Sequence, residues 1–532
     1  MKMKKQHFLF SVFLTVIVLS FFSCKKDQTP VEQLPNPEIK AGTANLSGKV
    51  MDYHGEKDEE PPFVYLQVFY PVTAEIMDYE TQLAVDGSFY FEEIPIECNT
   101  IGFIGSDIFN WTSVGVALIS NEETQVKILY DPNNPIQVQY TKNSLLAASD
   151  TILCSYELMD NFLHSPGSTR KKYYDMKPEE FRQYAMDRMK EKITFALDGE
   201  SLPPKAKNWI SNEFKLIYLA EVLLDYKDYM SLNYRNFKNE EEPDDFTPQE
   251  PDKSYYSFLK EFDLNNSQYL YNQTYSTVLE RILRNDTLSI PPIGDTPIDR
   301  WMKEVKEILS DLVGFDKGLF YDLLATNSYA QQFNDASRPL SNQQKENITN
   351  YFKGKKEEIA KILLNKNKEI EKIAGITAHL KINETPIVPE KELTDPAHDH
   401  PKGLLIDSIV ARYKGKVVLI DFWATWCSPC LKAMQTSREL KQEMIGKDVI
   451  FVYITNSSSP KELWEKKIQG IGGEHYYLEN DGEWESISYS DKYEFDGIPT
   501  YLIFDTNGVF KHKFTSYPGN DEMRKMLEEL IP

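Results

Sequence analysis

Two cysteines separated by two residues are the strongest chemical signal in this sequence of 532 residues. They are Cys427 and Cys430, with Ser428 and Pro429 between them. Two intervening residues allow both sulfurs to reach bonding distance within one helical turn. Such a pair can pass between dithiol and disulfide, because a thiolate attacks a disulfide sulfur through a mixed-disulfide intermediate. A Cys-x-x-Cys can also be half of a zinc site, so the surrounding residues decide between the two chemistries.

A zinc site would need two more ligands at suitable spacing. The sequence has no second Cys-x-x-Cys, and the candidate histidines are scattered along it: His398, His400, His475 and His512. We therefore expect no metal at this pair of cysteines. We also expect no separate cofactor, since the redox-active group would be the Cys427–Cys430 disulfide itself.

The segment before the cysteines predicts a buried strand, and the segment after them predicts a helix. Residues 417–423 are apolar apart from Asp421, a pattern typical of a central strand covered on both faces in a mostly parallel sheet. Residues 431–444 mix apolar and charged side chains with a helical period. The cysteines therefore lie at a strand-to-helix junction. Pro429 falls in the first turn, where a missing N–H costs nothing.

This placement gives the two sulfurs different tasks. Unpaired N–H groups and the positive end of the helix dipole favour an anion beside Cys427, so the pKa of its thiol should be lowered. Cys427 is then the sulfur that attacks a partner. Cys430 lies one turn further in and is less exposed, and it attacks the mixed disulfide and releases the reduced partner.

The segment from Asp421 to Cys430 reads D-F-W-A-T-W-C-S-P-C and resembles the active-site segment of the thioredoxin superfamily. It is especially similar to that of the exported, membrane-anchored thiol–disulfide oxidoreductases of the TlpA-like and ResA-like branch. The resemblance covers residues 385–532. It implies an α/β thioredoxin-like fold, in which helices flank a central sheet, and an enzyme that exchanges dithiol for disulfide with protein substrates.

The resemblance also assigns tasks to further residues. The segment Gly497-Ile498-Pro499-Thr500 matches the cis-proline loop of the family, which would present backbone to an extended substrate beside the sulfurs. The residues expected to bind substrate are Trp426, Ser428, Pro429, Ile498 and Pro499. Residues 470–496 exceed what a minimal domain of this family needs, and we expect a surface excursion there, with partner selection as the alternative.

Asp421 matches the buried acid of thioredoxins. A carboxylate on a buried strand loses its hydration, so its pKa should rise, and it can then move a proton to or from Cys430 through water. A structural aspartate with satisfied hydrogen bonds is the alternative. Thioredoxins often pair this acid with a lysine on the neighbouring strand, but the strand expected at 449–454 contains none.

Residues 44–140 carry the signals of a small β-sandwich. Short runs alternate between polar and apolar residues, as at 64–70 and 125–130, and an Asp-Gly turn stands at Asp86.

Residues 141–384 instead show apolar residues at helical spacing and predict a helical region, in which we find no catalytic motif. The clearest predicted helices are 178–197, 205–229, 298–313 and 355–373. For Cys98 in the sandwich and Cys154 in the helical region we expect two buried thiols, with a disulfide between them as the alternative.

The start of the chain reads as an export signal followed by a lipid-attachment site. Three lysines within the first five residues precede an apolar run from Phe8 to Phe22. Cys24 follows a small residue, which resembles the pattern of bacterial lipoproteins, whose signal is removed and whose cysteine is lipidated. We therefore expect a signal peptide at 1–23, lipidation of Cys24 and a flexible tether at 24–43.

The net charge of −23 argues against nucleic acid as a partner, because phosphate binding needs a basic surface. The expected partners are protein thiols and disulfides, with an upstream electron donor in the membrane or periplasm. These features together predict a cell-envelope reductase that is lipid-anchored and faces the periplasm or exterior. The alternatives are an envelope binding or scaffold lipoprotein with an auxiliary thioredoxin domain, and a thiol peroxidase.

Overall fold

The computed structural model describes most of the chain from residue 32 onward. The described residues are 32–53, 61–106, 108–109, 113–131, 134–142, 153–154, 156–163, 171–198, 202–238, 246–336, 338–354, 356–379, 404–468, 471–478, 481–489, 492–495 and 497–531. The expected signal peptide and Cys24 lie outside them. Contacts divide the chain into two compact units, one comprising 1–291 with 302–324 and the other 292–301 with 325–532.

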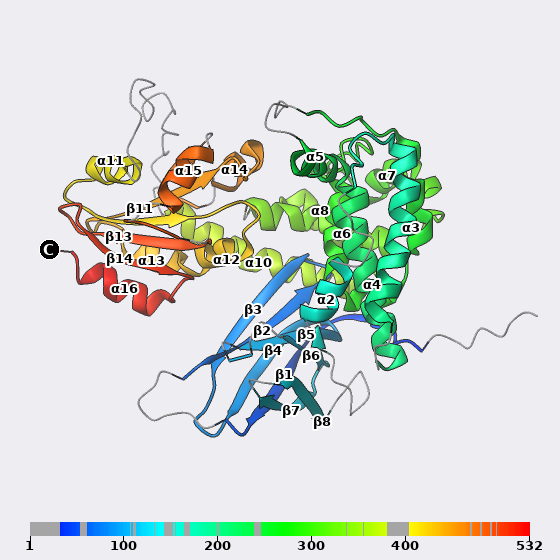
Figure 1. The fold of residues 1–532 in the computed structure, drawn as a ribbon, viewed down its shortest axis with the longest axis horizontal. Helices are drawn as coiled ribbons and strands as arrows, with labels where there is room; N and C mark the ends of the chain where they lie inside the picture. The colour runs from blue at the N-terminus through cyan, green and yellow to red at the C-terminus, as the bar shows by residue number, and fades with distance from the viewer. Residues whose placement is uncertain are drawn as a thin grey trace, which may run out of the picture. The chain divides into compact units, whose positions relative to one another are not determined.

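Two sheets enclose one hydrophobic core in the N-terminal part (Figure 1), which confirms the predicted β-sandwich. In spatial order the first sheet contains β4 (Ser88–Cys98), β1 (Ile39–Met51), β7 (Glu123–Asp131) and β8 (Asn134–Lys142). The second contains β3 (Glu75–Gln82), β2 (Phe63–Tyr70), β5 (Thr100–Ser106), β6 (Ser113–Leu118) and β9 (Leu153–Cys154). Alternate side chains of β2, among them Val64, Leu66 and Val68, enter the core, as the period of two requires.

The segment expected to be a tether differs from expectation where the structure describes it. β1 begins at Ile39, and Leu34 is buried with 4% of its surface exposed. Gln268 Nε2 donates a hydrogen bond to the carbonyl oxygen of Leu34 at 3.0 Å, and the hydroxyl of Tyr271 donates to that of Pro35 at 2.9 Å. These contacts hold residues 34–36 against the helical region.

Helices dominate the middle of the chain, as predicted. They are α2 (Tyr156–Leu163), α3 (Pro178–Leu197), α4 (Pro204–Tyr218), α5 (Tyr226–Phe237), α6 (Thr274–Leu283), α7 (Ile298–Val313), α8 (Leu319–Ala336), α9 (Asn342–Tyr351) and α10 (Glu357–His379). The helix predicted at 205–229 is interrupted by a π-helical turn, Leu219–Leu224, after which Asp225 leaves helical geometry with φ −90° and ψ 36°. Two 3₁₀ segments, Lys253–Phe262 and Ser267–Tyr271, complete the region.

The C-terminal domain contains a five-stranded sheet flanked by helices. In spatial order its strands are β12 (Glu474–Leu478), β11 (Val449–Asn456), β10 (Val417–Phe422), β13 (Thr500–Phe504) and β14 (Phe510–Thr515). β10 is the central strand and all its residues are buried, as predicted. The sheet is mixed, not mostly parallel, because β13 runs antiparallel to both β10 and β14. Residues 470–496 are no simple surface excursion, since they contribute β12 and α15 (Asp481–Ser488).

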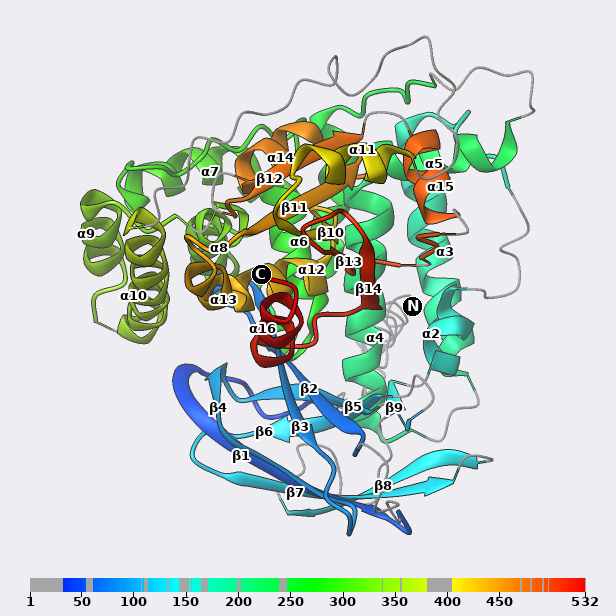
Figure 2. The same ribbon diagram turned by 90° about the vertical axis from the view of Figure 1, so that its left-hand side faces the viewer.

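Helices cover both faces of this sheet (Figure 2). Val418, Ile420 and Phe422 pack on one face with α11 (Leu404–Arg412) and α15. Val417 and Leu419 pack on the other face with three helices: α12 (Ser428–Thr436), α13 (Arg438–Glu443) and α16 (Asn520–Glu528). A further helix, α14 (Lys461–Ile468), follows β11. Asp421 lies two residues after Leu419 on β10, so the two side chains share a face of the sheet. Asp421 therefore points toward the face of α12 and α13.

Cys98 is a free, buried thiol whose pKa is raised by burial, as expected; the side chain of Cys154 lies outside the description.

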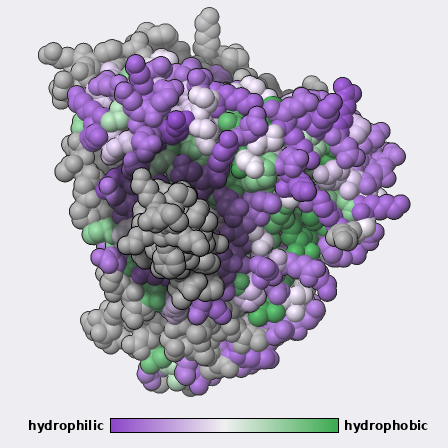
Figure 3. Space-filling model, turned by 90° about the vertical axis from the view of Figure 1, so that its right-hand side faces the viewer, coloured by the Kyte–Doolittle hydropathy of each residue, from purple (hydrophilic) through white to green (hydrophobic). Residues whose placement is uncertain are grey.

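The face in Figure 3 is mostly hydrophilic with apolar patches between, in keeping with a chain of which 27% is charged. Among the described residues no helix is long and apolar enough to cross a bilayer.

Candidate active site

The two cysteines lie at the junction of β10 and α12 and are joined by a disulfide, with 5.3 Å between their Cα atoms. α12 begins at Ser428, so Cys427 directly precedes the helix and Pro429 occupies its first turn, as the sequence predicted. The backbone N–H of Cys430 donates to Cys427 Sγ at 3.2 Å. A donor aimed at this sulfur favours its anionic form. Cys427 is 3% exposed and Cys430 is fully buried.

Apolar side chains surround the disulfide on its inner side. They are Trp423, Ala424, Met434, Tyr453 and Trp464. Trp423 is fully buried and belongs to this core, whereas Trp426 has 62% of its surface exposed beside the cysteines. Pro429 is also exposed, and the side chain of Ser428 lies outside the description. Trp426 and Pro429 therefore offer the exposed surface that the sequence expected beside the disulfide.

The loop before β13 approaches the outer sulfur. The peptide bond between Ile498 and Pro499 is cis, as expected from the sequence. Cys427 Sγ lies 3.7 Å from the carbonyl oxygen of Ile498. Pro499 is buried, and its carbonyl oxygen accepts a hydrogen bond from the backbone of Ser516 at 3.1 Å. The backbone of Ile498 thus stands beside the sulfur that is expected to meet a partner.

A serine-rich turn after β11 holds the active-site segment, and sequence reasoning missed it. The backbone N–H of Thr425 donates to Ser459 Oγ at 2.9 Å, and Trp426 Nε1 donates to Ser458 Oγ at 3.1 Å. Ser459 is fully buried, and its carbonyl oxygen accepts from the hydroxyl of Tyr477 at 2.7 Å. The parallel pairing of β10 and β11 was the available signal, because the carboxyl ends of parallel strands meet at one edge of a sheet.

Asp421 occupies the middle of the sheet, beneath the active-site segment. It is 3% exposed and lies in register with Tyr453 on β11 and Tyr501 on β13. Burial raises the pKa of its carboxyl well above the usual range, and the nearby charge of Lys441 opposes that rise. The direction is the one predicted from the sequence. Its Oδ1 has no hydrogen-bond partner among the described residues.

Sequence reasoning missed Lys441, because it lies on a helix and not on the strand next to Asp421. β11 contains no lysine, but Lys441 lies on α13 and its charge acts on Asp421. Burial lowers the pKa of Lys441 to about 7, although the charge of Asp421 raises it. Burial likewise lowers the pKa of His475 on β12 to about 3, so its ring is neutral at neutral pH.

The arrangement supplies what dithiol–disulfide exchange requires. One sulfur lies at the start of a helix, beside exposed surface and the backbone of Ile498, and the second is bonded to it one turn further in. A buried carboxyl group with a raised pKa lies on the strand that leads to them.

Comparison with known proteins agrees with this chemistry. A family model described as thioredoxin-like matches residues 415–510. Thiol-disulfide oxidoreductase ResA of Geobacillus kaustophilus is 27% identical over 145 residues, which are 27% of this chain and 76% of that protein. Thioredoxin-like protein YneN of Bacillus subtilis is 30% identical over 115 residues, 22% of this chain and 65% of that protein. Thiol:disulfide interchange protein DsbE of Vibrio cholerae is 27% identical over 145 residues, 27% of this chain and 70% of that protein.

Proposed function

We propose, from the premise that the C-terminal domain of this chain belongs to the thioredoxin superfamily and its ResA-like branch, that the protein reduces disulfides in other proteins. The observation that carries the proposal is the Cys427–Cys430 disulfide at the start of α12 beside the Ile498–Pro499 loop. The relatives named as thiol–disulfide oxidoreductases support the reaction class.

The reaction proceeds in two exchanges. The Cys427 thiolate attacks one sulfur of a partner disulfide, which forms a mixed disulfide and releases the other partner sulfur as a thiolate. Cys430 then loses its proton and attacks Cys427, so that the Cys427–Cys430 bond forms and the bond to the partner breaks. The partner gains two electrons and, from solvent, two protons. An upstream dithiol donor in the membrane or periplasm restores the reduced cysteines.

The substrate-binding surface consists of Trp426, Ser428, Pro429, Ile498 and Pro499. An extended partner segment pairs with the backbone of Ile498, which lies beside Cys427 Sγ. The exposed indole of Trp426 covers the partner from the other side and is held by its hydrogen bond to Ser458. Asp421 takes up the proton that Cys430 loses.

The proposal places the protein in the cell envelope, anchored by lipid on Cys24 after removal of residues 1–23. The basic start, the apolar run and the cysteine after a small residue support it. A Cys24→Ser variant that remains in the membrane fraction, or a wild-type chain that carries no lipid by mass spectrometry, would contradict this part without touching the redox assignment.

Trapping tests the reaction itself. A full-length Cys430→Ser variant should accumulate mixed disulfides through Cys427, which dithiothreitol releases for identification by mass spectrometry. Cys427→Ser should trap none and should not reduce a disulfide-bonded protein. Cys98→Ala, which removes a buried free thiol far from this chemistry in sequence, should behave as wild type. Equal trapping by all three variants would refute the proposal.

A further inference from the structure

The segment 492–495 leads into the cis-proline loop, and an acid on α11 holds its start. Asp407 Oδ1 accepts a hydrogen bond from the hydroxyl of Tyr493 at 2.7 Å and a second one from Lys492 Nζ at 2.8 Å. Tyr493 is fully buried, and its ring packs edge-on against phenylalanine rings of β13 and β14. A tyrosine buried in this way needs an acceptor for its hydroxyl, which Asp407 supplies. Asp407 therefore ties α11 to the segment before the loop.

Phe495 joins the same segment to the strand that carries the active site. Its ring lies 4.6 Å from that of Phe422, the last residue of β10, and 5.6 Å from that of Trp484 on α15, measured between centroids. Its backbone N–H donates to the carbonyl oxygen of Ser488 at 3.0 Å. The segment is thus fixed at Tyr493 and again at Phe495, immediately before the loop.

The backbone of Ile498, which faces the outer sulfur, depends on this segment for its place. Gly497 is exposed, and a methyl group on it would meet no atom within 4 Å apart from its chain neighbours. The side chain of Ile498 packs both on the apolar cluster of the cysteines and on the cluster that contains Tyr493 and Phe495. Its carbonyl oxygen lies 3.7 Å from Cys427 Sγ. A shift of Tyr493 and Phe495 would therefore move the backbone beside the sulfur.

We infer that Asp407 is a positioning residue for substrate recognition, which holds the cis-proline loop so that the Ile498 backbone can pair with a partner segment beside Cys427. The inference rests on the proposed function, because it concerns how an extended protein segment binds at that backbone. Asp407 acts on the loop through Tyr493 and not on the sulfurs. It should therefore affect the binding of protein substrates and not the reactivity of Cys427.

Two disulfides, one with and one without a peptide backbone, separate these two effects. Insulin carries its disulfides on peptide chains, whereas 2-hydroxyethyl disulfide has no backbone N–H or C=O that could pair with Ile498. The exchange is the same for both. Cys427 and Cys430 lose two electrons and two protons and form their disulfide, and the substrate disulfide gains two electrons and two protons and becomes two thiols.

The experiment mixes reduced full-length protein with an excess of either disulfide and follows oxidation of the cysteines by acid quenching, alkylation and mass spectrometry. Asp407→Ala and Tyr493→Phe should each raise the insulin concentration that gives half the limiting rate about threefold or more, as the loss of one hydrogen bond implies. The limiting rate should change less, and the rate with 2-hydroxyethyl disulfide should equal that of wild type. The double variant should be no worse than either single variant, because both remove the same hydrogen bond.

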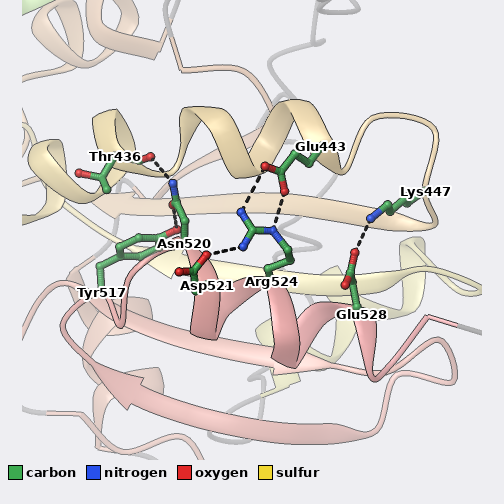
Figure 4. A network of polar contacts seen from close by, with 8 residues as sticks. All are labelled: Thr436, Glu443, Lys447, Tyr517, Asn520, Asp521, Arg524 and Glu528. Carbon is green, nitrogen blue, oxygen red and sulfur yellow. Dashed lines mark hydrogen bonds and ion pairs between the residues drawn. The ribbon is translucent and has the colours of Figure 1, made fainter.

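A conservative variant and a matched control complete the set. Asp407→Asn should keep most of the wild-type behaviour, because an amide oxygen still accepts from the phenol. Glu443→Ala is the control and should change neither rate. Glu443 accepts hydrogen bonds from Arg524 at 2.6 and 3.2 Å in the network that joins α13 to α16 on the other face of the sheet (Figure 4). Its side chain is 45% exposed and that of Asp407 is 42% exposed, so the two acids are similarly placed at the surface.

Hydrogen exchange of the oxidised full-length protein reports on the loop without catalysis. The amide of Phe495, which bonds to Ser488, should exchange faster in Asp407→Ala and in Tyr493→Phe, while the amides of β10 should exchange as in wild type.

Three results would overturn the inference. They are an unchanged insulin dependence in both Asp407→Ala and Tyr493→Phe, an equal slowing with both disulfides, and an Asp407→Asn variant no better than Asp407→Ala. A wild-type protein that reduces neither disulfide would instead overturn the proposed function.

Discussion

Asp421 and His475 should make the stability of the C-terminal domain depend on pH with opposite signs. An unfolded aspartate ionises near pH 3.9, but the buried Asp421 keeps its proton to higher pH. Between those two values the folded state binds one more proton than the unfolded state, so stability falls by about 1.4 kcal/mol for each pH unit of increase.

The buried imidazole acts in the other direction. The pKa of His475 is about 3 in the folded protein and about 6.5 when unfolded. Between these values the unfolded state binds the extra proton, so stability rises by about 1.4 kcal/mol per pH unit. Lys441, whose folded pKa is about 7, is protonated in both states below that pH and adds no slope there. Above about pH 3.9 and below about pH 6.5 the contributions of Asp421 and His475 therefore have opposite signs in wild type.

Single substitutions should reveal both slopes. Relative to wild type, Asp421→Asn should gain stability as the pH rises above about 3.9, and His475→Phe should lose about 1.4 kcal/mol of stability per unit as the pH rises from about 3 to 6.5. Asp521→Asn is the matched control, because the side chain of Asp521 is 98% exposed. Hydrogen exchange of the amides of β10, measured by mass spectrometry on the oxidised full-length chain, reads this domain alone. The reasoning would be refuted if the stability of both Asp421→Asn and His475→Phe depended on pH as that of wild type does, or if the two differences had the opposite signs.

Three further predictions concern the active-site surface and its support. Ser459→Ala should destabilise the domain by about 1 to 2 kcal/mol, because the buried N–H of Thr425 loses its acceptor, and urea denaturation followed by exchange of β10 measures the loss. Trp426→Ala should leave that stability within about 0.5 kcal/mol, since the side chain is 62% exposed, but should raise KM for protein disulfides more than it lowers kcat. Ser458→Ala should also raise KM for protein disulfides, but by less than Trp426→Ala does, because Ser458 accepts the hydrogen bond from the indole. Thr455→Ala is the control and should leave KM unchanged, because Thr455 bonds to Ser459 and not to the indole.

The local elements of the site could be predicted from the sequence because their signals are local. The apolar run at 417–423, directly before the Cys-x-x-Cys, predicted a buried central strand. The structure places β10 at the centre of the sheet. The cis bond before Pro499 followed from the resemblance of four residues. The buried state of Asp421 followed from its position in an apolar strand.

The partners that meet Asp421 and the cysteines in space could not be predicted in the same way. One helix was expected at 431–444, but the structure divides it at Ser437 into α12 and α13, and Lys441 lies on the second piece. The hydrophobic period of the sequence does not indicate such a break within a helix. β12 was hidden within a segment expected to be an excursion, so His475 and its stacking on Tyr453 were unforeseen. Both depend on tertiary contacts between distant segments.

Titration of the Cys427 thiol in the reduced full-length protein tests the central claim most directly. The rate of alkylation by iodoacetamide as a function of pH, read at Cys427 by mass spectrometry, gives the pKa. Because the N–H of Cys430 is directed at Cys427 Sγ at the start of α12, the pKa should lie below the value of about 8.5 for a free cysteine. A Cys427 that ionises at or above that value would contradict the account.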